Sequence, residues 1–429
     1  MKYVKNGIKA VIIAVLVISC NSAGRLEQKI TLTNTSLINL RDKAISVKRD
    51  SLKQVPSGYF PLLTTESGDT IASQLDDMNG DGKWDQLFFV SDIPAGDIIH
   101  LNLNWVKIQP DYTIRTSVRF GKRESKDSPV VPRTSDTLLA NQVPQVLGYQ
   151  PFQTDGPTWE NDKVGFRHYF DGRNANDLFG KKAPFMSPEN VGINAQGAVE
   201  DNYHVMADWG RDILSVGNSV GIGGFGLIIG DSIARLGIIG AKNDTLNNVD
   251  TTIFNIVAEG PVHSVLQFRY INWHAGNRIY QVNEKTSIWP GMYAYKNKVE
   301  ISGLHGDETL LVGLVNSNTD HPLGEIYEDD NFVILYTHDK QTYDKVWYLG
   351  LALILPKSAY LGFGEAPKNA PISNTFYGKL KIEDNTPVSY YAAGCWEIAD
   401  EGFRDSTYFK NYIADLAKEL AAKVNISVR

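Results

Sequence analysis

Residues 262–302 read VHSVLQFRYINWHAGNRIYQVNEKTSIWPGMYAYKNKVEIS. The segment holds three runs rich in β-branched and aromatic residues, and Gly, Asn and Pro residues separate them. Such runs between turn residues predict strands, and connections this short join antiparallel neighbours. The predicted strands are Val262–Ile271, Tyr280–Ile288 and Lys298–Ser302.

The same pattern continues on both sides of this segment, through most of the second half of the chain. No helical period appears before Thr407, which excludes a regular alternation of strands and helices. After it, Tyr408, Tyr412, Leu416 and Leu420 recur every four residues and predict one amphipathic helix that packs against the sheets. We therefore expect a mainly β domain, a large sandwich, over residues 141–429. Its other predicted strands are Gly224–Ile229, Arg235–Ile239, Thr252–Val257, Leu310–Val315, Phe332–Tyr336 and Val346–Leu355.

Residues 28–107 predict a separate, small antiparallel β-sandwich. Short alternating runs are separated by turns rich in Pro, Gly, Ser and Asp, a pattern typical of sandwiches of this size. The charged stretch Lys122–Asp127 and the prolines Pro129 and Pro132 follow one more alternating strand. We therefore predict that residues 108–140 form a linker with a surface segment.

A loop inside the first unit is rich in oxygen side chains. Asp77, Asn79, Asp81 and Asp85 occupy positions 1, 3, 5 and 9 of a calcium-binding pattern, with Gly82 at position 6. Position 12 should carry a bidentate glutamate, but Phe88 stands there. Two interpretations remain, a structural calcium ion or a turn in which Asp and Asn side chains bond their own backbone. No other cofactor is expected.

The N-terminus has the pattern of an export signal. Three lysines among the first nine residues precede the apolar run Ala10–Ile18, which is too short for a stable membrane span. The run ends in Val-Ile-Ser-Cys, which resembles a bacterial lipobox. The pattern predicts a signal peptide over residues 1–20 and a lipidated Cys20 that anchors an outer-membrane, periplasm-facing lipoprotein; the alternative is an uncleaved anchor helix. Beyond Cys20 only Cys395 remains, so no disulfide is expected.

Composition narrows the choice of partner. The chain has 42 Lys and Arg against 49 Asp and Glu and carries no basic stripe, which argues against nucleic acid. With 8 Trp and 20 Tyr it has the aromatic side chains that sugar-binding grooves use, although any large β-protein has many.

The region Val249–Ile301, with Gly260–Val262, Leu266–Tyr270 and Ile288–Gly291, resembles the galactose-mutarotase-like β-supersandwich. Aldose epimerases and domains of several polysaccharide lyases and glycosidases share that architecture. The whole chain after residue 28 is similar to a family of Bacteroidetes lipoproteins of unknown function. The resemblance implies a supersandwich and an association with the degradation of polysaccharides, including uronate-containing ones. It implies no catalytic residues.

Chemistry-bearing residues are densest between Thr158 and Gly226. If residues 163–168 form a strand, Lys163, Gly165 and Arg167 share one face, where two cations suit a substrate carboxylate. The alternative is a surface strand whose cations pair with Glu160 and Asp162.

A second candidate group is Tyr203 and His204, which precede Asp208 and Trp209. A histidine here suits a general base because its pKa lies near operating pH. The alternative is a structural histidine.

His263 and Arg269 share the parity of a predicted strand and suit a polar groove face, with buried core polarity as the alternative. Trp396 and Glu397 form a further aromatic–acid pair, with a solvated glutamate as the alternative. The complete set of predicted substrate-binding residues is Trp159, Glu160, Asp162, His168, Trp209, His263, Arg269, Trp396 and Glu397.

Three functions fit these residues. The first is β-elimination on oligosaccharides from a uronate-containing polysaccharide, by a lyase or by a dehydratase at a terminal sugar. His204 would be its base, Arg167 and Lys163 would neutralise the carboxylate, and Tyr203 would be the acid. The second is hydrolysis by paired carboxylates, and the third is an oligosaccharide-binding lipoprotein without catalysis. Elimination is favoured because the cations exceed what a neutral sugar needs. The carboxylates considered for hydrolysis are Glu160, Asp162, Asp208 and Glu397.

Overall fold

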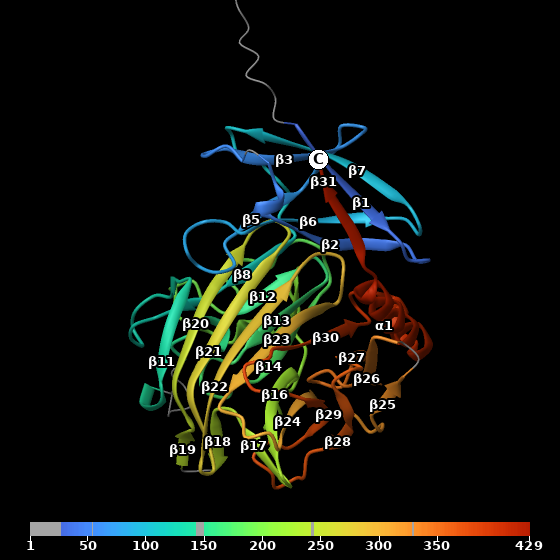
Figure 1. Cartoon of the computed structure of the whole chain (residues 1–429). Coiled ribbons are helices and arrows are strands. Elements are labelled where there is room, and N and C mark those ends of the chain that lie inside the picture. The colour runs from blue at the N-terminus through green and yellow to red at the C-terminus, as the bar shows by residue number, and fades with distance from the viewer. Residues whose placement is uncertain (1–26, 54, 143–149, 242–243, 328–329) are drawn as a thin grey trace, which may run out of the picture.

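Antiparallel sheets are the dominant structure of the described residues, and one α-helix accompanies them there (Figure 1). The computed structural model describes residues 27–53, 55–142, 150–241, 244–327 and 330–429. The predicted signal peptide, residues 1–20 with Cys20, lies outside them. The prediction of a mainly β chain with a C-terminal helix is confirmed.

The N-terminal unit consists of two facing sheets. A five-stranded sheet has the order β31-β1-β7-β3-β4 and a three-stranded sheet the order β2-β6-β5. Their apolar faces enclose a core of their own, with Leu32, Phe89 and Leu101 at its centre. The strands are β1 (Gln28–Asn34), β2 (Leu40–Lys48), β3 (Phe60–Thr65), β4 (Thr70–Ile71), β5 (Ser73–Asp76), β6 (Gln86–Ile93), β7 (Ile98–Val106) and β31 (Val424–Val428).

The last strand changes the expected division of the chain. β31 pairs with β1, with Ile30 opposite Val428, so the C-terminal end completes the N-terminal sheet. The predicted unit 141–429 therefore contributes a strand to the sheet of the unit 28–107. An edge strand leaves unpaired backbone groups, and β31 supplies partners for those of β1.

A nine-stranded sheet forms the main layer of the rest of the molecule. Its order is β11-β20-β21-β22-β23-β30-β27-β26-β25. Side chains alternate between its faces, so that Phe268 and Tyr270 point into the core while Arg269 is exposed. The strands are β11 (Ser135–Leu139), β20 (Val249–Glu259), β21 (Ser264–Ala275), β22 (Arg278–Ile288), β23 (Ala294–Ser302), β25 (Gly324–Ile326), β26 (Phe332–Asp339), β27 (Leu349–Pro356) and β30 (Val388–Trp396).

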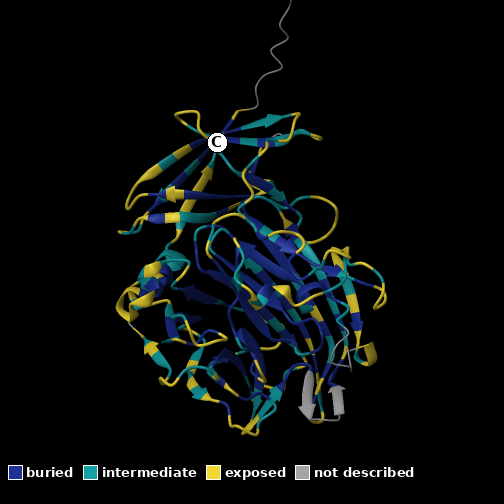
Figure 2. Cartoon of the chain, turned by 180° about the vertical axis from the view of Figure 1, so that it is seen from behind, coloured by how far each residue is buried: buried dark blue, intermediate teal, exposed yellow. Residues whose placement is uncertain are grey.

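Two five-stranded sheets, β15-β14-β13-β12-β8 and β17-β16-β24-β29-β28, pack against the inner face of the main sheet. Phe166, Val312 and Phe268, one from each sheet, belong to one apolar core, which Figure 2 shows as buried strands. The first sheet contains β8 (Thr116–Arg119), β12 (Thr158–Asn161), β13 (Val164–His168), β14 (Asn176–Lys181) and β15 (Gly210–Asp212), and the second contains β16 (Ile222–Ile229), β17 (Ser232–Arg235), β24 (Glu308–Val315), β28 (Tyr360–Glu365) and β29 (Thr375–Lys381).

The segment predicted as a linker, 108–140, is part of these sheets. β8 pairs with β12, and β11 pairs with β20, so both strands are held by backbone hydrogen bonds. The prolines lie in a short ribbon beside them, where few ladder bonds are needed. The ribbons are β9 (Gly121–Lys122) with β10 (Val131–Pro132), and β18 (Ile238–Ala241) with β19 (Asp244–Asn247).

The helix α1 (Ser406–Ala421) begins where the Asp405 carboxylate accepts a hydrogen bond from the Tyr408 N–H, at 2.8 Å. Phe409, Ile413 and Ala417 are buried beneath it. Within the described residues, no helix is long and apolar enough to cross a bilayer. Short 3-10 turns are η1 (Arg49–Ser51), η2 (Ala140–Gln142), η3 (Gln153–Asp155), η4 (Asn202–His204) and η5 (Glu401–Arg404).

An ionic joint fixes the N-terminal unit against the large sheets. Arg115 donates to both Asp42 oxygens, at 2.7 and 2.8 Å, and to Asp162, at 2.6 Å. The Gly291 N–H donates to Asp162 at 3.0 Å, and Gly291 has φ +88°, a conformation that favours glycine. A Cβ at Gly291 would lie 2.4 Å from the Asp42 carboxylate. The turn between β22 and β23 therefore packs closely on β2.

Candidate functional site

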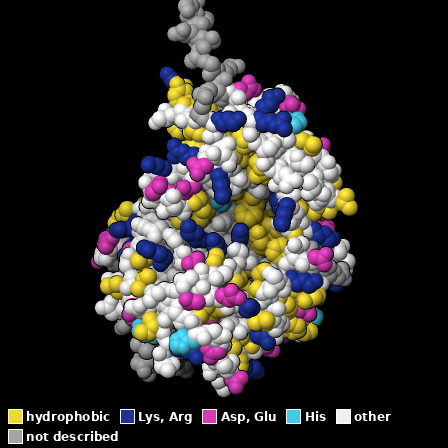
Figure 3. Space-filling model, in the orientation of Figure 1, with side chains coloured by type: hydrophobic (Ala, Val, Ile, Leu, Met, Phe, Trp, Pro, Cys, Tyr) yellow, Lys and Arg dark blue, Asp and Glu magenta, His cyan; other side chains and the backbone are white. Residues whose placement is uncertain are grey.

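A cleft of about 910 Å³ lies between the N-terminal unit, the outer face of the main sheet and α1. Figure 3 shows it as a hollow with an apolar floor and Lys and Arg side chains on its rim. The apolar stripe predicted on α1 lines it, since Tyr408, Tyr412, Leu416 and Leu420 all face this space. The remaining aromatic lining is Phe88, Trp289 and Tyr391.

A buried histidine–aspartate pair opens onto this cleft. The Nδ1 atom of His263 lies 2.7 Å from an Asp76 oxygen. Asp76 also accepts hydrogen bonds from Gln74 at 2.6 Å and from Gln86 at 2.9 Å, so its position is fixed. The His263 ring stacks on Phe88, with ring centres 3.9 Å apart. A carboxylate at Nδ1 selects the tautomer that carries its proton there, and Nε2 bonds to none of the described residues.

Lys296 and Tyr391 stand opposite each other on β23 and β30, on the wall of the same cleft. Burial, with the nearby charge of Lys298, lowers the pKa of Lys296 below its ordinary value. Burial raises the pKa of Tyr391 to about 12. Among the described residues, neither side chain has a hydrogen-bond or ion-pair partner, so both polar groups are available to a ligand.

Lys43 joins the wall formed by β2 to the end of α1. Its Nζ donates to the carbonyl oxygens of Glu419, at 2.5 Å, and Leu420, at 3.3 Å. A cation at a helix C-terminus interacts favourably with the helix dipole. Burial lowers the pKa of Lys43 to about 8, and the charge of Glu419 opposes part of this shift.

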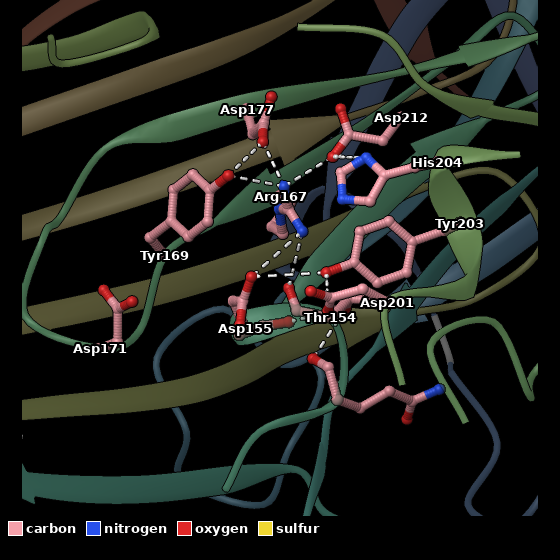
Figure 4. Close-up of polar contacts among 12 residues, drawn as sticks. Thr154, Asp155, Arg167, Tyr169, Asp171, Asp177, Asp201, Tyr203, His204 and Asp212 are labelled. Atoms are coloured by element: carbon pink, nitrogen blue, oxygen red, sulfur yellow. Dashed lines mark hydrogen bonds and ion pairs between the residues drawn. The ribbon is translucent and has the colours of Figure 1, made fainter. Parts of the chain in front are cut away.

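The predicted catalytic Arg167 does not line the cleft; it lies on β13, in a buried ionic cluster (Figure 4). Its Nη2 atom donates to Asp177, to Asp212 at 2.8 Å and to the Tyr169 hydroxyl at 2.7 Å. A further carboxylate, that of Asp155, lies 3.5 Å from Nη1. The guanidinium is enclosed and already neutralised, so it cannot also bind a substrate carboxylate as predicted.

Tyr203 and His204 adjoin this cluster. The Tyr203 hydroxyl donates to Asp201 at 3.0 Å, and burial raises the pKa of Tyr203. His204 Nδ1 lies 3.8 Å from an Asp212 oxygen, and burial and the Arg167 charge lower the pKa of His204. Burial and the neighbouring Asp177 raise the pKa of Asp212 well above its ordinary value. Arg167, Tyr203 and His204 therefore do lie close together, as predicted for a site, but they surround protein carboxylates.

Lys163 does not share a face with Arg167, because β13 begins only at Val164 and Lys163 lies in the turn before it. Its Nζ lies 5.8 Å from the Tyr293 ring centre.

The other predicted residues have mostly structural partners. Glu160 is buried and bound by Lys181 and Ser187. His168 is buried, with Nδ1 2.9 Å from the Asn176 side-chain oxygen. Glu397 accepts the Tyr348 N–H at 3.0 Å. Asp162 belongs to the ionic joint, and Arg269 is exposed. The three predicted tryptophans, Trp159, Trp209 and Trp396, are buried in the cores.

The Asp-rich loop is closed by its own backbone. Asp85 accepts the N–H groups of Met78 and Asn79, at 2.7 and 3.1 Å, and Asp77 accepts those of Gly80 and Gly82, both at 2.7 Å. These are the bonds expected of the turn interpretation. Calcium at Asp77, Asn79, Asp81 and Asp85 stays a prediction.

Sequence reasoning found His263 but missed Asp76, Lys43, Lys296 and Tyr391. Asp76 precedes the Asp-rich loop, whose carboxylates masked it. The signal for Lys296 was available in strand parity, because it alternates with the inward Tyr295 and Asn297. No local sequence pattern indicates that the segments carrying these four residues meet at one cleft.

Comparison with known proteins gave one family and weak relatives. A family model described as "Domain of unknown function (DUF4861)" matches residues 32–426. "Uncharacterized protein P7" of Formosa agariphila is 23% identical over 297 residues, which cover 66% of this chain and 69% of that protein.

Two solved structures from Enterococcus faecalis, an alpha-mannosidase and a protein in glycosyl hydrolase family 38, are each similar with a TM-score of 0.46 and 9% identity. Each match covers 94% of this chain, which spans about half the length of those proteins (46% and 47%).

Proposed function

The chain belongs to the DUF4861 family of unknown function, and we propose that it binds an acidic oligosaccharide in the cleft and acts on it by β-elimination. The reaction is that of a lyase or of a dehydratase at a terminal sugar. The observation that carries the proposal is the Asp76–His263 pair, whose imidazole lines the same cleft as Lys296 and Tyr391.

The lining suits a charged sugar. Flat aromatic faces such as that of Trp289 pack against sugar C–H groups, and indole and phenol groups also reach hydroxyls. The ammonium of Lys296 supplies a positive charge for a carboxylate. A half-buried cation without a protein partner carries a desolvation cost, and an anionic ligand would offset that cost.

In the proposed step, His263 Nε2 takes the proton from the carbon next to the sugar carboxylate. The electron pair of that C–H bond forms a C=C bond, and the bond from the adjacent carbon to its leaving oxygen breaks. Lys296 stabilises the negative charge that develops on the carboxylate. Tyr391, which is protonated at neutral pH, gives its hydroxyl proton to the leaving oxygen.

Hydrolysis by paired carboxylates has less support. Among the carboxylates considered, Glu160 and Asp162 are bound by cations, while Glu397 accepts a backbone N–H and Asp208 is exposed. None of the four lines the cleft. Binding without catalysis is the second candidate, because the Asp76–His263 bond also ties β5 to the main sheet.

We keep the lipidated Cys20, and with it a periplasm-facing outer-membrane location, as part of the proposal. Its support is the N-terminal sequence pattern alone.

Incubation of the whole protein with uronate oligosaccharides tests the reaction. The expected result is a rise in ultraviolet absorbance from the unsaturated product. New reducing ends without that absorbance would replace elimination with hydrolysis. Saturable binding with neither change would leave a binding protein.

A further inference from the structure

Basic side chains continue beyond the cleft along the outer face of the main sheet. Lys298 lies two residues from Lys296 on β23, and Lys285 on β22 stands directly opposite Lys298. Arg269, exposed on β21, stands opposite Asn283, two residues from Lys285 on the same face. These cations therefore share one face of the sheet and form a patch that starts inside the cleft. One acid, Glu300, lies on the same face, two residues from Lys298 and opposite Asn283.

The patch is unfavourable for the protein by itself. Like charges directly opposite each other in neighbouring strands are destabilising. No carboxylate among the described residues lies within 4.0 Å of Lys285, Lys296, Lys298 or Arg269. The charge of Lys298 also lowers the pKa values of Lys285 and Lys296, in addition to the effect of burial.

The acidic residues near the patch do not neutralise its positive charge. Asp85 and Glu300 raise the pKa of Lys285, yet less than burial and Lys298 lower it. The Asp85 carboxylate is occupied by N–H groups of its loop. Lys285 has one structural contact, a hydrogen bond from Nζ to the Met78 carbonyl at 3.1 Å. That contact holds the Lys285 ammonium in place. Lys298 and Arg269 have no ion-pair partner among the described residues. Such clustering of Lys and Arg side chains is unexpected in a chain whose net charge is −7.

We propose that Lys285, Lys298 and Arg269 form a second anion-binding site, which takes the acidic group of the sugar next to the one bound at Lys296. Two residues along a strand span about 7 Å, so the second anion lies beyond the cleft on the exposed sheet. The ligand is then an oligosaccharide with acidic groups on at least two sugars. This inference rests on the proposed function and goes further, because it sets a minimum length and charge for the ligand.

Binding of uronates of different length tests the second site. Isothermal titration of the full chain with mono- and tetragalacturonate should show tighter binding of the longer probe. Lys298→Gln and Arg269→Gln should each weaken tetragalacturonate binding by about tenfold, the effect of one lost charge-assisted bond. Binding of the monouronate should change less than about twofold. Lys48→Gln, an exposed lysine on β2, is the matched control and should change neither.

A sulfated oligosaccharide of equal length separates carboxylate from sulfate as the bound group. If it binds more tightly and shows the same dependence on Lys298 and Arg269, the anion is a sulfate. Equal affinity of the wild-type protein for mono- and tetragalacturonate and for the sulfated probe would overturn the second site. Tetragalacturonate binding that is unchanged by both substitutions would also overturn it.

The proposed reaction and the proposed second site can be rejected independently of each other. His263→Ala should slow formation of the unsaturated product by about a hundredfold or more and leave tetragalacturonate binding within about twofold. Loss of length dependence with normal turnover would reject the second site alone, whereas length-dependent binding without product would reject the reaction alone.

Discussion

His204 and His263 each lie beside a buried aspartate, but their surroundings differ. His263 lies 2.7 Å from its aspartate and lines the cleft, whereas His204 lies 3.8 Å from Asp212 and adjoins the ionic cluster. The sequence between Thr158 and Gly226 suggested a groove because a buried ionic cluster and a sugar site use the same residue types. The density of charged and aromatic residues along the chain could not distinguish an ionic cluster from a sugar site, because the two differ in burial.

The ionic cluster should make stability depend on pH through Asp212. Its folded pKa is raised above 3.8, so its contribution to stability is fully present below that value and is lost as the pH rises through the raised pKa. Asp212→Asn removes this titration. The melting temperature of the variant, relative to the wild type, should therefore increase from about pH 4 to about pH 8.

Thermal denaturation followed by circular dichroism checks this trend. The control is Asp208→Asn, because the Asp208 side chain is exposed. A difference between Asp212→Asn and wild type that stays flat across this range would contradict the burial of an ionisable Asp212.

At the scale of elements, periodicity predicted most of the strands and the helix well, because alternation and a four-residue repeat are local properties. The predicted strand Arg235–Ile239 is wrong, since a bend at residues 236–237 separates β17 from β18. Periodicity was less informative about which elements pack or pair with one another. The stripe Tyr408–Leu420 was expected against the sheets, and Tyr412, Leu416 and Leu420 do pack on the main core. The stripe also lines the cleft, while Phe409 and Ile413 are buried beneath the helix. Residues 108–140 contain prolines and charges, but the pairing of β8 and β11 depends on strands far away in sequence.

The contact between β2 and α1 should respond to alkaline pH. Folding lowers the pKa of Lys43 from 10.5 to about 8, so between these values the unfolded chain binds more protons and the free energy of unfolding rises with pH. Lys43→Met lacks this term. The melting temperature of the wild type should therefore gain on that of Lys43→Met between about pH 7 and about pH 10. A constant or falling difference would contradict the buried position of Lys43.

The turn between β22 and β23 should tolerate no side chain. Gly291→Ala combines a positive φ with a Cβ only 2.4 Å from the Asp42 carboxylate, and we expect it to lower the free energy of unfolding by about 2–4 kcal/mol. Gly276→Ala is a matched control, with φ +64° and no atom within 4 Å of the added carbon. It should cost only the backbone strain, about 1 kcal/mol. Urea denaturation compares the two, and equal losses would show that β2 does not press on this turn.

At the scale of the whole molecule, the cleft gathers residues 37–46, 263, 287–296, 391 and 408–420. Sequence reasoning predicted the mainly β class and single residues such as His263. It could not predict that β31 returns to β1 and places α1 beside β2, because no local pattern encodes that long-range pairing. The site therefore depends on the joining of both ends of the chain.

The central claim is that His263 in the cleft, and not His204 beside the ionic cluster, is the base. The direct measurement is the rate of unsaturated product formation by His263→Ala and His204→Ala on the same uronate oligosaccharides, with the fold of each checked by circular dichroism. We predict that His263→Ala loses about a hundredfold or more in turnover, as expected for a missing general base, while His204→Ala keeps most of it. Full turnover by His263→Ala, or its selective loss in His204→Ala, would contradict the assignment.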